Sequence, residues 1–181
     1  RRTRFTLVGV RHQRPSGNTW VCIDTGLANR LASLLLQGRR VPGLNHLSQV
    51  HAEVTVGDSR LDFRLESGDG QCGWAEVKCV TLAVGDQARF PDAPTVRGAK
   101  HLRHLTQVAQ EGGTAAVLFV VQRDDVSTFA PNLEQDAVFA TALGEAAQAG
   151  VLVHAVSCIM NAERLAAVRW LPVVRPRAVS P

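Results

Sequence analysis

Two stretches of the sequence place acidic residues and a lysine where they could act together on a phosphate. From Arg60 to Leu65, polar and apolar residues alternate, so Asp62 faces away from the apolar side of the predicted strand. In the stretch Trp74–Val80, Glu76 and Lys78 share one face in the same way. A turn centred midway between the strands would place positions 62 and 76 opposite each other, with Cβ atoms roughly 4.5–5.5 Å apart. The spacing therefore predicts two carboxylates and an ammonium on one face of a β-hairpin.

Two facing carboxylates repel each other, so the predicted pair requires compensation. A shared proton could supply it, and so could a divalent cation. Mg²⁺ (or Mn²⁺) is typically held by one or two carboxylates together with phosphate oxygens and water. The neighbouring Lys78 could then hold an attacking water or stabilise charge that develops on the phosphate. The chemistry that this set indicates is phosphodiester hydrolysis. The alternative is a solvated polar face with a cross-strand ion pair, worth ~0–1 kcal/mol.

Further strands and helices must position the hairpin. The predicted strands are Phe5–Val10, Thr19–Ile23, His51–Val56, Arg60–Leu65, Trp74–Val80, Ala115–Val121 and Val151–Cys158. The predicted helices run from Asp24 to Gln37, from Val96 to Gln110 and from Asp136 to Ala149. Meandering strands followed by alternating helices and strands predict the α/β class, with a mixed central sheet flanked by helices.

Composition limits the class of protein. The 181 residues suit one domain, and 45% hydrophobic with 20% charged residues is typical of a folded chain rather than a disordered one. No apolar run approaches the ~20 residues of a membrane span, which excludes an integral membrane protein. Four scattered cysteines without a Cys-x-x-Cys pair argue against a zinc site and favour a reducing, cytoplasmic compartment. The net charge of +4 is compatible with a polyanionic partner.

Four segments around these residues resemble the sugar fermentation stimulation protein A family of bacteria and archaea, and the resemblance covers nearly the whole chain. The matching segments are Asp24–Leu31, Gly57–Phe63, Glu76–Leu82 and Phe90–Leu102. The resemblance implies an OB-like barrel followed by a domain with the restriction-endonuclease-like PD-(D/E)xK core. On this basis residues 1–171 form the nuclease-fold domain, with 1–23 as leading strands after a missing barrel. Residues 172–181 are expected to form a flexible tail.

The resemblance also implies roles for individual residues. Asp62, Glu76 and Lys78 correspond to the acid, acid and lysine of the nuclease-fold active site, with Asp62 and Glu76 as metal ligands. Glu53, on the preceding strand, is either an additional metal ligand or a surface residue. Family members are described as DNA-binding proteins and as regulators of sugar, especially maltose, metabolism.

Several basic and polar residues are candidates for DNA contacts. Arg97 and His101 share one face of the second predicted helix, with Lys100 beside them, and such a stripe could contact phosphates. Arg60 and Thr81 are further candidates near the hairpin. The alternative for the helix is an ordinary solvated surface, and His101 is expected to orient a neighbour rather than to bind metal.

The sequence leaves three functions open. The protein is a metal-dependent nuclease, a non-catalytic DNA-binding regulator, or an interaction domain that binds no nucleic acid. It also leaves open whether the protein forms a homo-oligomer.

Overall fold

The computed structural model describes residues 4–14, 17–56 and 59–174, and it describes side chains for all of these except 53–60. The helices are α1 (Thr25–Gln37), α2 (Val96–Gln110) and α3 (Ala137–Gln148). The longer strands are β1 (Gly9–Arg14), β2 (Gly17–Cys22), β3 (Leu47–Val56), β4 (Ser59–Ser67), β5 (Cys72–Val80), β8 (Thr114–Val121), β10 (Leu152–Met160) and β11 (Leu165–Leu171). The shorter strands are β6 (Ala83–Val84), β7 (Gln87–Phe90) and β9 (Thr128–Pro131).

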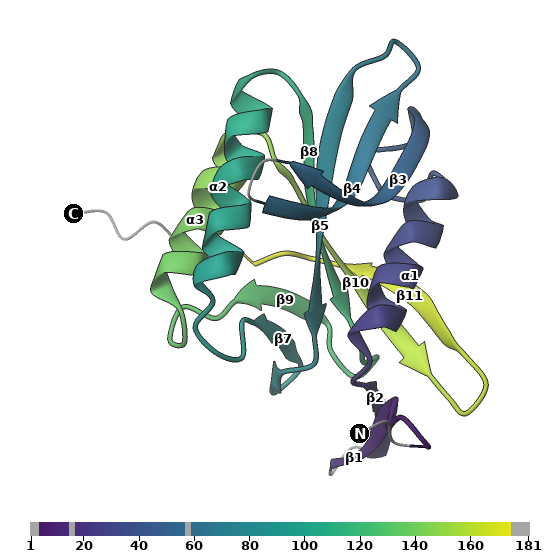
Figure 1. The fold of residues 1–181 in the computed structure, drawn as a ribbon. Coiled ribbons are helices and arrows are strands. Elements are labelled where there is room, and N and C mark those ends of the chain that lie inside the picture. The colour runs from purple at the N-terminus through teal and green to yellow at the C-terminus, as the bar shows by residue number, and fades with distance from the viewer. Residues whose placement is uncertain (1–3, 15–16, 57–58, 175–181) are drawn as a thin grey trace.

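The central sheet has six strands in the order β11-β10-β8-β5-β4-β3. Strands β5, β8 and β10 run parallel to one another, while β3, β4 and β11 join as antiparallel neighbours. Helices α2 and α3 cover one face of the sheet, and α1 lies against the other (Figure 1). The predicted α/β class with a mixed sheet between helices is confirmed.

Local sequence explains where the helices begin. The Asp24 side chain accepts the Gly26 N–H at 2.8 Å at the start of α1, and Thr95 Oγ1 accepts the Gly98 N–H at 3.0 Å at the start of α2. Asp136 caps α3 by accepting the Phe139 N–H at 2.8 Å, and its second oxygen accepts the Thr95 N–H at 2.8 Å. One carboxylate therefore joins the first turns of α2 and α3.

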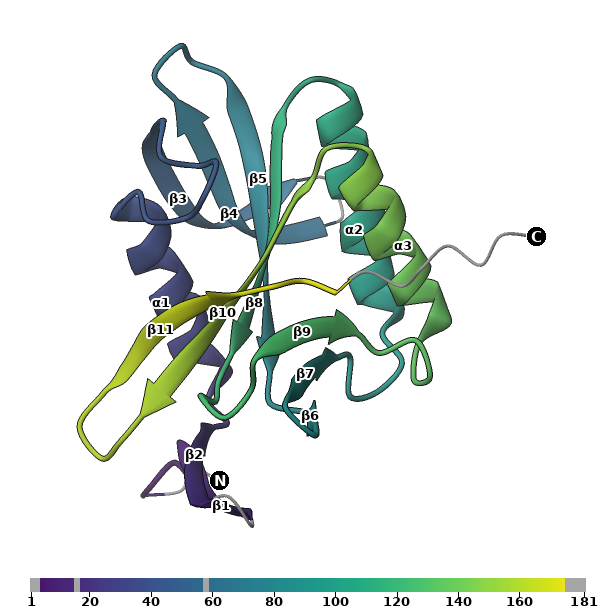
Figure 2. The same cartoon turned by 180° about the vertical axis from the view of Figure 1, so that it is seen from behind.

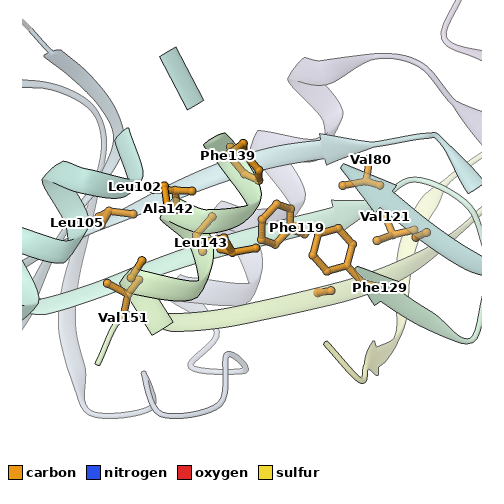
Figure 3. Packing of buried hydrophobic residues seen from close by; sticks show 14 of the residues in the cluster. Val80, Leu102, Leu105, Phe119, Val121, Phe129, Phe139, Ala142, Leu143 and Val151 are labelled. Atoms are coloured by element: carbon orange, nitrogen blue, oxygen red, sulfur yellow. The ribbon is translucent and has the colours of Figure 1, made fainter. Parts of the chain in front are cut away.

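The core lies on both faces of the sheet because β8 is apolar along nearly its whole length. Such a run is typical of a strand covered on both sides. Under α2 and α3, Phe119 stacks on Phe129 with ring centroids 4.2 Å apart and meets the ring of Phe139 edge-on (Figure 3). Under α1, Phe63 and Leu118 belong to a second buried cluster. The sheet that carries the hairpin is thus held from both sides.

The β4–β5 hairpin has the predicted register. Phe63 pairs with Ala75, and Glu66 pairs with Cys72. The ladder ends at Phe63, however, so the two strands separate where Asp62 and Glu76 would otherwise pair directly. Strands β3 and β4 also bend, and the last part of β3 and the first part of β4 cross the sheet toward α2 in both views (Figures 1 and 2).

Three parts of the expected secondary structure were wrong or missing. The first strand is Gly9–Arg14 rather than Phe5–Val10, because these residues pair with β2, from Gly9 beside Cys22 to Arg14 beside Gly17. The segment Leu82–Thr95, for which no strand was predicted, contains β6 and β7, and β7 pairs with β9 in a small separate sheet. Strand β11 was not predicted either. These strands depend on distant partners more than on their own short sequences.

Within the described residues, no helix is long and apolar enough to cross a membrane. All four cysteines, each among those residues, are free thiols.

Candidate metal site on the central sheet

Asp62 lies where β4 and β5 separate. Its Oδ2 atom accepts the backbone N–H of Val77 at 2.8 Å. That N–H belongs to β5, the strand that carries Glu76. The Asp62 side chain therefore bonds to the backbone of β5 just beyond the point where the backbone pairing of β4 and β5 ends. The Asp62 carboxyl group is close enough to Glu76 for the charge of Glu76 to raise its pKa.

Glu76 is the most buried acidic residue of the candidate site, at 4% exposure. Its Oε1 atom lies 2.6 Å from Lys78 Nζ and also contacts His101 Nδ1. Its Oε2 atom is buried and accepts no hydrogen bond from the residues that the structure describes. An anionic oxygen without a partner is costly to bury, so Oε2 indicates a place for a cation.

The surroundings separate the pKa values of the two carboxyl groups. Burial raises the pKa of Asp62, and repulsion by Glu76 raises it further, against the opposing Val77 N–H. Burial also acts to raise the pKa of Glu76, but the hydrogen bond from His101 and the Lys78 ammonium outweigh it, and the pKa is lowered. Glu76 is therefore the more readily ionised of the two carboxyl groups. A bound cation would stabilise the ionised form of Asp62 more than that of Glu76, because the surroundings of Asp62 disfavour its charge.

A groove adjoins Asp62 on the side of α1. Its volume is about 480 Å³, within the range of ligand-binding pockets. It is lined by Asp24, Gly26, Leu27, Asn29, Arg30, Ser33, Ala52, Asp62 and Phe63. The first two turns of α1 thus face the candidate site across a concave surface, and Arg30 supplies a positive charge to its lining.

The structure places Asp62, Glu76 and Lys78 near one another, as predicted. Two of the other candidates cannot be placed in the site. The side chains of Glu53 and Arg60 lie outside the described residues. The β3–β4 register, with Ala52 beside Phe63 and Val54 beside Leu61, brings the backbone of residue 53 level with residue 62.

The candidates for DNA contacts are spread over α2 and the end of β5. Arg97 and Lys100 are exposed on α2, and Thr81 is half-buried just after β5. His101 is 3% exposed, so it does not belong to an exposed basic stripe. Successive helical positions are about 100° apart, which leaves residue 101 at the edge of the face that packs on the sheet.

Sequence reasoning missed two features of the site. The contact between His101 and Glu76 joins α2 to β5, and no pattern within either segment reveals it. The groove residues Asn29 and Arg30 lie in a segment that matches the family but were not identified as site residues. The signal that could have identified Arg30 is that it is a charged residue near the start of α1, within a segment that matches the family.

The donor set can be compared with what Mg²⁺ or Mn²⁺ needs. Among the described residues there is no group of three or more His, Cys, Asp or Glu side chains that could hold a metal ion. The carboxylates of Asp62 and Glu76 nevertheless suit a hard cation that keeps water and substrate oxygens as its other ligands. The buried Oε2 of Glu76 is the oxygen left free for such an ion among the described residues. The residues fit such an ion.

Fold and site together define an α/β protein with a curled mixed sheet and an acidic pair beside a lysine. A family model described as "Sugar fermentation stimulation protein RE domain" matches residues 26–164. The chain belongs to the sugar fermentation stimulation protein family.

Relatives and a solved structure agree with this assignment. A sugar fermentation stimulation protein homolog of Clostridium acetobutylicum is 37% identical over 174 residues, which cover 96% of this chain and 74% of the homolog. One of Acetivibrio thermocellus is 43% identical over 177 residues, with the same coverage of 96% and 74%. The solved structure of Pyrococcus furiosus SfsA in complex with Ca²⁺ matches with a TM-score of 0.85 at 29% identity, covering 96% of this chain and 73% of that chain.

Proposed function

We propose that this protein is a divalent-metal phosphodiesterase that acts on DNA. Asp62 and Glu76 would hold Mg²⁺ or Mn²⁺, and Lys78 would act on the phosphate or on the attacking water. The observation that carries the proposal is the buried, unpartnered Oε2 of Glu76, whose other oxygen lies 2.6 Å from the Lys78 ammonium and whose charge acts on the nearby Asp62. The Ca²⁺ complex of the Pyrococcus furiosus relative supports a divalent ion in this fold.

Each site residue has a role that follows from its contacts. Glu76 stays ionised because Lys78 and His101 stabilise its negative charge. Asp62 uses one oxygen to accept the Val77 N–H, which fixes the orientation of the carboxylate toward β5. Lys78 has three N–H donors, of which one is directed at Glu76 Oε1, and the others can donate to a water or to a phosphate oxygen.

A bound divalent ion would supply positive charge to the phosphoryl group under attack. The protein's own contribution is to hold that phosphate and the water in line. Lys78 lies 2.6 Å from Glu76, so its ammonium is close to the place where the ion and the phosphate would meet. An ammonium fixed in this way stabilises developing negative charge, and removal of such a group typically slows a reaction by about 10²–10³-fold.

The DNA path that we propose runs from the groove beside α1, past Asp62, toward the start of α2. Arg30 in the groove and the exposed Arg97 and Lys100 on α2 would contact phosphates. Thr81 and Arg60 are the further candidates. The four free thiols favour a reducing compartment, so we place this activity in the cytoplasm.

The test is cleavage of plasmid and single-stranded DNA with Mg²⁺ or Mn²⁺. Wild-type protein is expected to cut, and EDTA is expected to stop the reaction. Lys78→Ala and Glu76→Gln are expected to lose about 10²-fold or more in rate. The matched control is Arg103→Ala, which removes a positive charge from an exposed position of α2. Absence of cleavage by the wild type, or equal cleavage by Lys78→Ala, would exclude catalysis.

The second candidate function, favoured by the exposed Arg97 and Lys100 on α2, is a non-catalytic DNA-binding regulator of sugar (maltose) metabolism genes. It predicts DNA binding that weakens linearly in a plot of log affinity against log salt, without metal-dependent cleavage. Replacing Arg97 or Lys100 by Ala should lower the affinity and reduce the salt slope by about one for each lost phosphate contact. Binding that does not depend on salt would count against both functions.

A further inference from the structure

The two oxygens of Glu76 have unequal surroundings. Oε1 contacts both the Lys78 ammonium and His101 Nδ1, whereas the buried Oε2 has no hydrogen-bond partner among the described residues. The donors come from two elements, because Lys78 is on β5 and His101 is on α2. Because two donors on different elements bind Oε1, they fix the orientation of the whole carboxylate, and with it the direction in which Oε2 points.

The hydrogen bonds of His101 determine where its proton lies. Arg97, four residues earlier on α2, directs its Nε–H at His101 Nε2 over 3.3 Å. An arginine donates and does not accept, so Nε2 must be the acceptor. The proton of a neutral imidazole is then on Nδ1, where it donates to Glu76 Oε1. Both ring nitrogens are used, and this arrangement leaves neither as a metal ligand.

The helix that carries His101 is firmly held. Leu102 and Leu105 of α2 are buried, at 1% and 0% exposure, in the core shared with α3. The α2 N-terminus is joined to α3 through the Asp136 carboxylate. His101 itself is 3% exposed. Its donor group therefore approaches Glu76 from a rigid element and in a single direction.

We propose that His101 is a positioning residue for the metal site: its Nδ1–H fixes Glu76 so that Oε2 faces the cation, and Arg97 fixes the histidine tautomer. This inference rests on the proposed function, because it requires that Glu76 bind a divalent ion. Removal of such a supporting partner typically lowers metal affinity about 10–100-fold.

The first experiment is calorimetric titration of Mg²⁺ and Mn²⁺ into metal-free protein. His101→Ala is expected to bind about 10–100-fold more weakly than the wild type. His101→Asn places an amide N–H near the position of Nδ1 and is expected to recover most of the affinity. Arg97→Ala is expected to have a smaller effect, because the ring can still donate. Arg103→Ala removes a charge from the same helix without a contact to the site residues described above, and it is expected to bind like the wild type.

The second experiment is independent of metal. In the ¹⁵N spectrum of the metal-free protein, Nδ1 of His101 is expected to carry a proton and Nε2 to act as the acceptor, and in Arg97→Ala the tautomer should no longer be fixed. Thermal unfolding of each variant shows whether it is folded. If His101→Ala does not fold, the comparison is made with His101→Asn instead.

The outcomes separate the two proposals. Wild-type protein that binds no divalent ion overturns the proposed function and this inference together. Wild-type protein that binds metal while His101→Ala binds it equally well overturns this inference alone. An Nε2–H tautomer, or no recovery by a folded His101→Asn variant, overturns it as well.

Discussion

Replacing Asp62 by Asn should stabilise the metal-free protein. The Asn side-chain oxygen can still accept the Val77 N–H that Asp62 Oδ2 accepts at 2.8 Å. The substitution removes a negative charge that burial and Glu76 both disfavour. Two like charges that lie about 5 Å apart would repel by about 3 kcal/mol at an effective dielectric constant near 20 and by about 0.8 kcal/mol in bulk water.

Asp62 is half-buried, so we expect a gain in the free energy of unfolding between these limits, of about 1–2 kcal/mol. In a domain of this size that gain raises the Tm by about 2–8 °C. The assay is thermal unfolding in EDTA and in an excess of Mg²⁺. In Mg²⁺ the wild type should gain about 2.7 kcal/mol at a metal concentration of 100 Kd, and the variant should gain little, so the order of stability reverses.

The pH dependence has a definite sign. The pKa of Asp62 in the folded protein is raised from the ordinary value of 3.8. The ionised side chain therefore weakens the fold at neutral pH, and this effect disappears as the pH falls below that value. The advantage of Asp62→Asn in EDTA should be full at pH 7 and absent in strong acid. A variant less stable than the wild type in EDTA at pH 7, or one that Mg²⁺ stabilises as much as the wild type, would refute the reasoning.

Three other predictions concern the scaffold, each checked by denaturant unfolding. Phe119→Ala empties a position stacked on another aromatic ring and should lower the free energy of unfolding by about 3–5 kcal/mol. Asp136→Ala removes the acceptor shared by the first turns of α2 and α3 and should lower it by about 1–2 kcal/mol, whereas Asp136→Asn should lose less. Burial opposes ionisation of Asp125, but hydrogen bonds from Arg123 and Arg14 lower its pKa to about 2. Asp125→Asn should therefore lose about 1–2 kcal/mol at pH 7, and this difference should disappear as the pH falls from about 4 to about 2.

The parts of the fold that could be predicted are those with local signals. Helix α2 begins and ends at the expected residues because Thr95 caps its first turn and a glycine pair follows it. The hairpin register followed from the alternation of β4, whose apolar residues Leu61, Phe63 and Leu65 are all buried. For the same reason Asp62, Glu76 and Lys78 could be placed together before the structure was known.

What could not be predicted depends on partners far away in the chain. The end of the β4–β5 ladder at Phe63 follows from the bend of the sheet, not from the sequence of the hairpin. The burial of His101 follows from how α2 docks on β5. The short strands β7 and β9 pair with each other across an intervening helix and strand, and a segment of four residues carries too little pattern to reveal this.

The crossover from β5 through α2 to β8 determines when the site can assemble. Asp62 and Val77 are separated by 15 residues and meet within one hairpin, whereas Glu76 and His101 are separated by 25 and meet only across that crossover. Contacts of greater sequence separation form later, because a longer loop must be closed first. We therefore expect the acidic pair to come together early in folding. The histidine should reach it only when the second helix docks, so the cation-binding geometry is among the last features of the native state to appear.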